Sequence, residues 1–98
     1  MTRSNVLTFL QEHKSEFKSK FGIDQVALFG SFARDEATQD SDIDLLITYV
    51  NNPGDVYTNK QNFKKFLKTY FHRNIDVANK KYLKPFAKEN ILKEAIYV

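Results

Sequence analysis

The stretch from Phe29 to Ile47 constrains this chain more than any other, because it links two apolar runs through residues suited to phosphate and metal. A Gly-Ser pair ends the first run, and ten residues later Asp42 and Asp44 open the second. Glycine lets a backbone approach phosphate oxygens closely, while serine and exposed N–H groups donate hydrogen bonds. Carboxylates at positions i and i+2 of a strand face the same side and can share divalent cations. The stretch therefore predicts a site for a metal-bound nucleotide.

Length and composition predict one folded domain, residues 1–98. The chain has 98 residues, 42% of them apolar, and no cysteine. It is thus long enough to bury a core, and disulfides, thiol catalysis and cysteine-bound metals are excluded. The lack of cysteine also favours a reducing compartment, and we expect the cytoplasm. No segment has the length and apolar content of a membrane span or a secretory leader, so we expect no membrane partner.

Charge is distributed unevenly around a net value of +3. Residues 24–55 carry seven acids against Arg34 alone, whereas residues 60–94 carry ten bases against three acids. Carboxylates for cations beside lysines for phosphates are what a metal and polyphosphate site needs. Most of these lysines are also explained as the solvated faces of helices.

The apolar spacing predicts an α+β unit around a small sheet. The expected elements are a helix from Ser4 or Thr2 to Gly22, a central strand from Asp24 to Phe29, a short helix from Phe32 to about Ala37, a strand from Ile43 to Val50, a helix from Asp55 to about Phe71, a strand from Asn74 to Asn79, a helix starting near Pro85, and a last tetrad that forms either an edge strand or a frayed helix end. His13 is expected at the edge of the core.

A third aspartate completes the candidate chemistry. Ile43 faces the helices in the expected second strand, so Asp42 and Asp44 face the other side. Asp76 lies in the last of the three main strands, where a buried carboxylate is costly unless a partner such as a shared metal compensates it. Nucleotidyl transfer uses two divalent ions about 4 Å apart. We therefore expect Asp42 and Asp44 to bridge two Mg²⁺ ions and Asp76 to complete the site that activates the attacking hydroxyl.

Two other site classes fit less well. Asp40, Asp42 and Asp44 alternate as in a calcium loop, but Leu45 stands where the sharp turn needs glycine and Asn51 where a bidentate glutamate is needed. A nucleic-acid-binding module would use the basic second half of the chain. Its aromatic residues instead fit a helix core, and an acidic patch repels phosphates unless metal fills it. Nucleic acid is therefore not an expected partner.

Gly30-Ser31-Phe32-Ala33-Arg34 followed by Ser41-Asp42-Ile43-Asp44-Leu45-Leu46-Ile47 resembles the signature of the minimal nucleotidyltransferases, the MNT branch of the DNA polymerase beta-like superfamily. The resemblance covers nearly the whole chain. It implies a polymerase beta palm-like fold, with a small mixed sheet and helices mainly on one face. It also implies Asp42, Asp44 and Asp76 as catalytic metal ligands, and Gly30, Ser31, Arg34 and Ser41 as nucleotide-binding residues. Asp35 stands where the family more often has glycine.

The same resemblance implies an activity and a partner. Such enzymes use Mg²⁺ to transfer a nucleoside monophosphate, usually AMP from ATP, to a hydroxyl acceptor. Many members of this size are MntA-like antitoxins that are paired with a HEPN-domain toxin, and some adenylylate a tyrosine of that toxin. A catalytically weak antitoxin, which neutralises its partner by binding alone, is the alternative.

Overall fold

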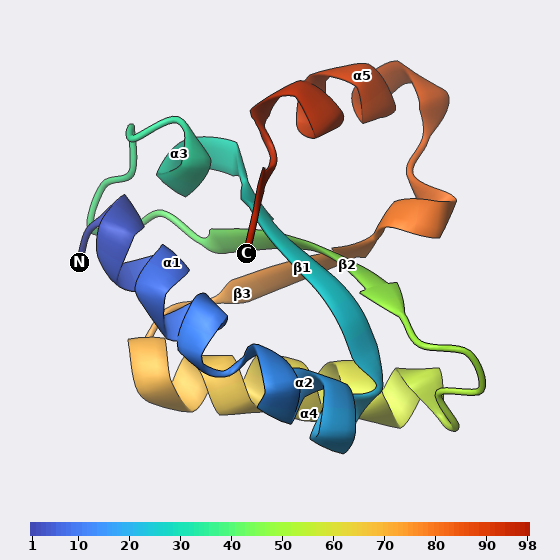
Figure 1. Ribbon diagram of the computed structural model, residues 1–98. Helices are drawn as coiled ribbons and strands as arrows, with labels where there is room; N and C mark the ends of the chain where they lie inside the picture. The colour runs from blue at the N-terminus through green and yellow to red at the C-terminus, as the bar shows by residue number, and fades with distance from the viewer.

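A computed structural model describes all 98 residues as one four-stranded sheet with helices around it (Figure 1). In chain order the elements are α1 (Arg3–Glu12), α2 (Lys14–Phe21), β1 (Ile23–Phe29), α3 (Gly30–Ala33), β2 (Ile43–Tyr49), α4 (Val56–Phe71), β3 (Ile75–Asn79), a 3₁₀ turn (Lys80–Tyr82), α5 (Pro85–Glu94) and β4 (Ile96–Tyr97). The predicted α+β class is confirmed. No helix is long and apolar enough to cross a membrane.

The sheet is mixed, as predicted, and its strand order is β3-β2-β1-β4. β1 pairs antiparallel with β2 and with β4, whereas β2 and β3 run parallel. The apolar β1 is therefore central, as its composition indicates. The last residues form the short edge strand β4, which resolves the two possibilities left by the sequence.

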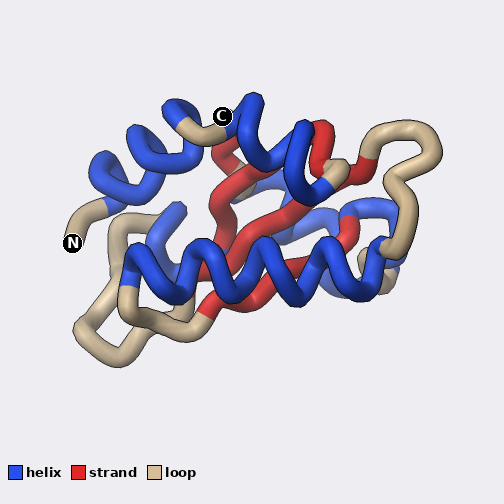
Figure 2. The backbone as a smooth tube through the Cα atoms, turned by 90° about the horizontal axis from the view of Figure 1, so that it is seen from below, coloured by secondary structure: helices blue, strands red, loops and turns tan.

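The main core lies between one face of the sheet and the three helices α1, α2 and α4. Figure 2 shows α4 crossing that face of the sheet. Aromatic side chains fill the layer, and Phe17 meets Phe63 edge to face with 5.0 Å between ring centroids. Ile43, Leu45 and Ile47 of β2 are buried against this layer, because alternate residues of a strand face the same side. The expectation that helices pack mainly on one face is confirmed.

The opposite face of the sheet is covered less completely. Ala27 and Leu46 are buried there, but α5, which lies across the sheet from α4 in Figure 1, contains no buried residue.

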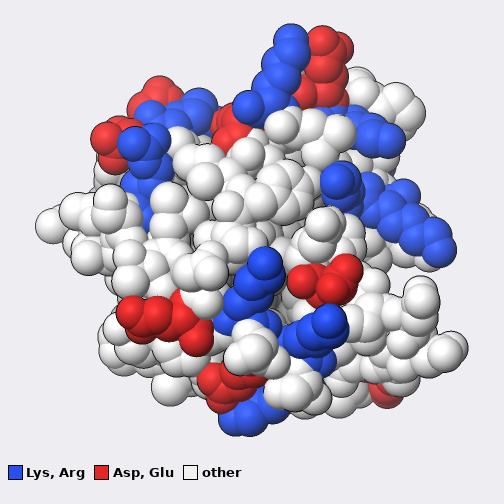
Figure 3. All heavy atoms as spheres, in the orientation of Figure 1, with Lys and Arg blue, Asp and Glu red and all other residues white.

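The acidic and basic halves of the sequence do not form two separate surfaces on the face seen in Figure 3, where both signs of charge surround a mostly uncharged centre.

The first helical segment is broken, and the prediction of one helix up to Gly22 is wrong in this respect. His13 ends α1 and begins α2. Its ring Nδ1 lies 2.9 Å from the Phe9 carbonyl oxygen, which also accepts the His13 backbone N–H. A side chain that enters the hydrogen-bond ladder bends a helix. His13 is half-buried and stacks on Phe9, so its expected place at the core edge is confirmed.

The short helix is also displaced from its predicted bounds. α3 begins at Gly30 itself and ends at Ala33, instead of running from Phe32 to Ala37. Asp35 has a left-handed backbone (φ 61°), which stops the helix. The other boundaries agree with the predictions to within one residue, including the Asp55 side-chain cap of α4 and the end of α2 at left-handed Gly22.

Candidate functional site

Gly30 brings the turn after β1 into contact with Asp44 of β2. Its φ is +74°, a region that residues with a side chain rarely adopt. A Cβ built at this position would overlap the Asp44 carboxylate and would lie 2.9 Å from Asp44 Cγ. Only glycine therefore leaves room for this carboxylate against the turn. The Gly-Ser turn and Asp44 therefore lie directly against each other.

Sheet pairing sets Asp44 beside Asp76. Asp44 of β2 is in register with Asp76 of β3 on one side and with Phe29 of β1 on the other. Neighbouring strands lie about 4.8 Å apart, so the two carboxylates project side by side from the same face. Asp42 lies just before β2, two residues from Asp44, and is exposed. The structure thus places the three predicted aspartates at one end of one sheet face.

The electrostatic effect of this grouping is concentrated on Asp44. Its pKa is raised from 3.8 to about 6, chiefly because the half-buried carboxyl is removed from water. The negative charges of Asp76 and then Asp42 raise the pKa further, while Arg34 opposes them. A proton is therefore held more tightly here than on an ordinary aspartate. Raised carboxyl pKa values of this kind are frequent at functional sites.

One expectation about the aspartates needs correction, and the metal site of Asp42, Asp44 and Asp76 stays a prediction. Asp76 was expected to carry a burial cost, but it is exposed, because β3 is an edge strand. The half-buried carboxylate is Asp44. In addition, no three His, Asp or Glu side chains converge closely enough to hold a metal ion between them. Asp44 and Asp76 nevertheless form a pair of hard oxygen donors, and a divalent cation would relieve the repulsion between them. The donor set therefore fits Mg²⁺ with water and phosphate oxygens as its other ligands.

The two serines of the motifs differ in what they contact. No hydrogen bond within the chain uses the half-buried Ser31 side chain, so its hydroxyl is available to a ligand. The Ser41 hydroxyl accepts the Thr38 backbone N–H at 2.8 Å and so closes the loop before Asp42. Arg73 supports the same loop by donating to the carbonyl oxygens of Thr38 and Ser41, each at 2.9 Å. Sequence reasoning missed Arg73, since nothing local links it to a loop over thirty residues earlier.

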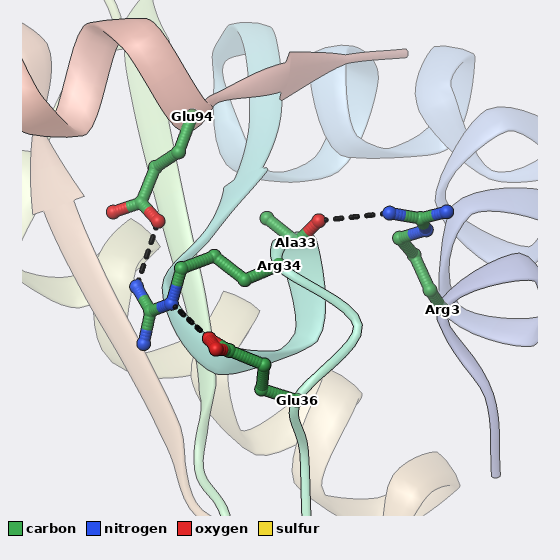
Figure 4. Close-up of polar contacts among 5 residues, drawn as sticks. All are labelled: Arg3, Ala33, Arg34, Glu36 and Glu94. Carbon is green, nitrogen blue, oxygen red and sulfur yellow. Dashed lines mark hydrogen bonds and ion pairs between the residues drawn. The ribbon is translucent and has the colours of Figure 1, made fainter.

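Arg34 is held by two carboxylates. Its Nε donates to Glu36 at 2.9 Å and its Nη1 to Glu94 at 2.7 Å (Figure 4). These contacts raise the pKa of the Arg34 guanidinium, with Glu94 the larger cause. On the other side of the turn, Arg3 of α1 donates to the Ala33 carbonyl at 3.0 Å. Both ends of the chain thus hold the turn that carries Gly30 and Ser31.

Asp35 preserves the backbone turn although it departs from the family pattern. Its positive φ is of the kind that glycine adopts without strain, and aspartate is one of the few other residues that tolerate it. The turn after Arg34 therefore keeps the conformation expected for glycine, and the Arg34 side chain still reaches Glu94 across the site.

A mixed sheet that presents paired aspartates beside a Gly-Ser turn defines a nucleotidyltransferase site, and comparison with known families agrees. The model of the nucleotidyltransferase domain family matches residues 10–98. The chain therefore belongs to the nucleotidyltransferase domain family, and the enzyme class predicted from the motif is confirmed.

Curated relatives match along the whole chain. "Putative protein adenylyltransferase MJ1379" of Methanocaldococcus jannaschii is 32% identical, and the match covers 99% of this chain and 98% of the relative. "Protein adenylyltransferase MntA" of Thermococcus cleftensis is 29% identical over 100% of this chain and 97% of the relative. The chain is thus similar in extent as well as in sequence to proteins named as protein adenylyltransferases.

Solved structures support the same fold. One described as "Structure of putative minimal nucleotidyltransferase" is 28% identical with a TM-score of 0.79, covering 98% of this chain and 95% of that chain. Another, "Crystal structure of the toxin-antitoxin with AMP-PNP", has a TM-score of 0.67 over 99% of this chain and 72% of that chain. Its 11% identity shows a shared fold alone.

Proposed function

We propose that this chain is a Mg²⁺-dependent protein adenylyltransferase that transfers AMP from ATP to a hydroxyl group of a partner protein. The observation that carries the proposal is the register of Asp44 with Asp76 beside Gly30, whose missing side chain makes room for the Asp44 carboxylate. The names of its full-length relatives support a protein as the acceptor.

The residues divide the work of binding and transfer. The Gly30 backbone and the free Ser31 hydroxyl hold the outer phosphates of ATP, with Arg34 as a further donor. Asp42 and Asp44 would hold two Mg²⁺ ions, with Asp76 as a further ligand. When bound, Mg²⁺ supplies neutralisation of the charge that develops on the transferred group. Ser41 is assigned here a supporting role, because its hydroxyl closes the loop that presents Asp42.

Asp76 lies where an acceptor can reach it. It is exposed on the edge strand β3, beside the half-buried Asp44. In the proposed reaction the acceptor hydroxyl is oriented at this edge, its oxygen forms the new bond to the α-phosphorus of ATP, and pyrophosphate leaves as its bond to that phosphorus breaks. The hydroxyl proton passes to solvent at the same exposed edge.

For the acceptor we propose a tyrosine of a HEPN-domain toxin, which makes the chain the antitoxin of a toxin–antitoxin pair. The family resemblance supports this pairing, and the toxin–antitoxin structure with AMP-PNP shares the fold. One observation favours the alternative of a catalytically weak antitoxin that acts by binding: no three acidic side chains converge on a single point in this structure.

The test combines a transfer assay with a neutralisation assay. Wild type and the Asp42→Ala/Asp44→Ala double variant are each incubated with labelled ATP, Mg²⁺ and a candidate HEPN-domain toxin. The proposal predicts label on the partner with the wild type only, and loss of neutralisation in the double variant. If the double variant still neutralises the toxin, binding alone is sufficient and the alternative is correct. If the wild type transfers no label and is not stabilised by ATP with Mg²⁺, the enzymatic proposal is wrong.

A further inference from the structure

We propose that Glu94, the last residue of α5, is a positioning residue for this site: it fixes the Arg34 guanidinium beside the Gly30-Ser31 turn, ready to bind phosphate. The inference rests on the proposed function, since it assigns a role within the same nucleotide site. It goes beyond the sequence motif, because Glu94 lies sixty residues from Arg34 and belongs to neither half of that motif.

The geometry leaves Arg34 able to bind a ligand while it is held. The Arg34 Nη1 to Glu94 Oε2 distance is 2.7 Å, and the Nε to Glu36 Oε1 distance is 2.9 Å (Figure 4). A guanidinium has five N–H donors in a planar fork, so three remain for phosphate oxygens. The Arg34 side chain is 49% exposed, which leaves those donors accessible. The charges of both partners reach Asp44, because Arg34 lowers and Glu94 raises the pKa of that carboxyl.

Glu94, and not Glu36, supplies the fixed point. The Glu94 side chain is only 22% exposed and belongs to a separate helix, whereas the Glu36 side chain is 60% exposed and lies two residues after Arg34 in the same turn. A partner in the same turn moves together with the arginine. A partner on α5 ties the arginine to the C-terminal segment, which is itself joined to β1 through β4.

A purely stabilising role explains this contact less well. Ion pairs in which the arginine is half exposed, as Arg34 is, contribute little to stability, and α5 has no buried residue. By contrast, an arginine that binds phosphate must lose rotamer freedom, and fixing it beforehand removes part of that cost. The Arg34–Glu94 contact is therefore expected to contribute more to nucleotide affinity than to the stability of the fold.

The test measures the KM for ATP and kcat in Glu94→Ala and Glu94→Gln. We expect Glu94→Ala to raise the KM about tenfold and to leave kcat within about twofold. Glu94→Gln, which keeps a hydrogen-bond acceptor, should recover part of the loss. Glu89→Ala is the matched control, because Glu89 lies on the same helix, is 76% exposed and pairs only with Lys93. It should behave as the wild type does.

Two further measurements separate the possible failures. In an Arg34→Met background, Glu94→Ala should have no additional effect on KM, because Glu94 acts through Arg34. In the free protein, NMR relaxation should show greater motion of the Arg34 Nε–H group in Glu94→Ala but not in Glu89→Ala. Unchanged motion, or a KM that is unchanged or lowered in an active Glu94→Ala enzyme, overturns this inference alone. A wild type that neither binds nor transfers the nucleotide overturns the proposed function together with it.

Discussion

The two faces of the sheet differ in what they contribute. On the face covered by α1, α2 and α4, strand β2 buries Ile43, Leu45 and Ile47 in the aromatic core. On the other face the same strand presents the half-buried Asp44 against the Gly30 turn, and α5 on that side contains no buried residue. Strand residues alternate between the two faces of a sheet. Alternate residues of β2 therefore pack in the core, while Asp44, which lies between two of them in the sequence, faces the candidate site. Stability and activity should therefore respond to different substitutions.

Replacing Asp44 by asparagine should produce the largest loss of activity while the chain stays folded. Asn keeps the size of the side chain but removes the charge that holds a divalent cation. We expect kcat/KM for AMP transfer to fall about 10³-fold, with the circular dichroism spectrum of the wild type. Asp24→Asn is the control, since Asp24 is an exposed acid of β1 outside the site. A folded Asp44→Asn variant with wild-type transfer would contradict the division between the two faces.

Truncating a core phenylalanine should give the opposite result. Phe63 is fully buried under the sheet, whereas Phe86 of α5 is 82% exposed. We expect Phe63→Ala to lower the free energy of unfolding by about 3–5 kcal/mol, a large share of the total for a small domain. Phe86→Ala should change it by less than about 0.5 kcal/mol. Urea denaturation measures both, and similar values for the two variants would show that the faces do not differ.

Gly30→Ala tests the point where the turn and the carboxylate meet. The new Cβ must displace the Asp44 carboxylate, and we expect transfer to fall about 10²-fold, as small misplacements of catalytic groups do. Gly54→Ala is the control, because Gly54 has a similar φ of +79° with nothing within 4 Å of a new Cβ. Both variants carry the backbone strain, so only the first should lose activity.

The smallest effect concerns pH and stability. The folded-state pKa of Asp44 is raised, from 3.8 to about 6, so the fold favours its protonated form. Loss of the Asp44 proton as the pH rises from 3.8 to about 6 therefore lowers the free energy of unfolding. The whole of this loss of stability is present above about pH 6. Without metal, Asp44→Asn should melt a few degrees higher than the wild type at pH 7.5 and close to it at pH 4. Mg²⁺ binding should weaken below about pH 6, since protons compete for the same oxygens.

Local sequence patterns predicted much of this molecule. The spacing predicted one apolar face of α4, and the Gly-Ser and aspartate motifs predicted the class of the enzyme. Phe63, Leu67 and Phe71 of that face are buried, whereas Val56 and Tyr70, which were predicted with them and with Phe66, are exposed. These features depend on residues close together in the chain or on motifs with known spacing. Strand register then follows, because a shift by one residue would bury Asp44 in the core.

Long-range side-chain contacts were not predictable in this way. Glu94 meets Arg34 across sixty residues, and Arg73 holds the loop around Ser41 from more than thirty residues away. The break at His13 depends on one ring nitrogen reaching a carbonyl oxygen, which helical periodicity does not reveal. The exposure of Asp76 follows from the edge position of β3, and strand order is not encoded in the alternation of a single strand.

The most direct test of the central claim follows the fate of each ATP phosphate. Wild type, Mg²⁺ and the partner protein are incubated with ATP labelled at either the α- or the γ-phosphorus. A nucleotidyltransferase that uses Asp42 and Asp44 must transfer the α label to the partner and release the γ label in pyrophosphate, and Asp44→Asn must do neither. Transfer of the γ label, or equal transfer of the α label by Asp44→Asn, would contradict the account.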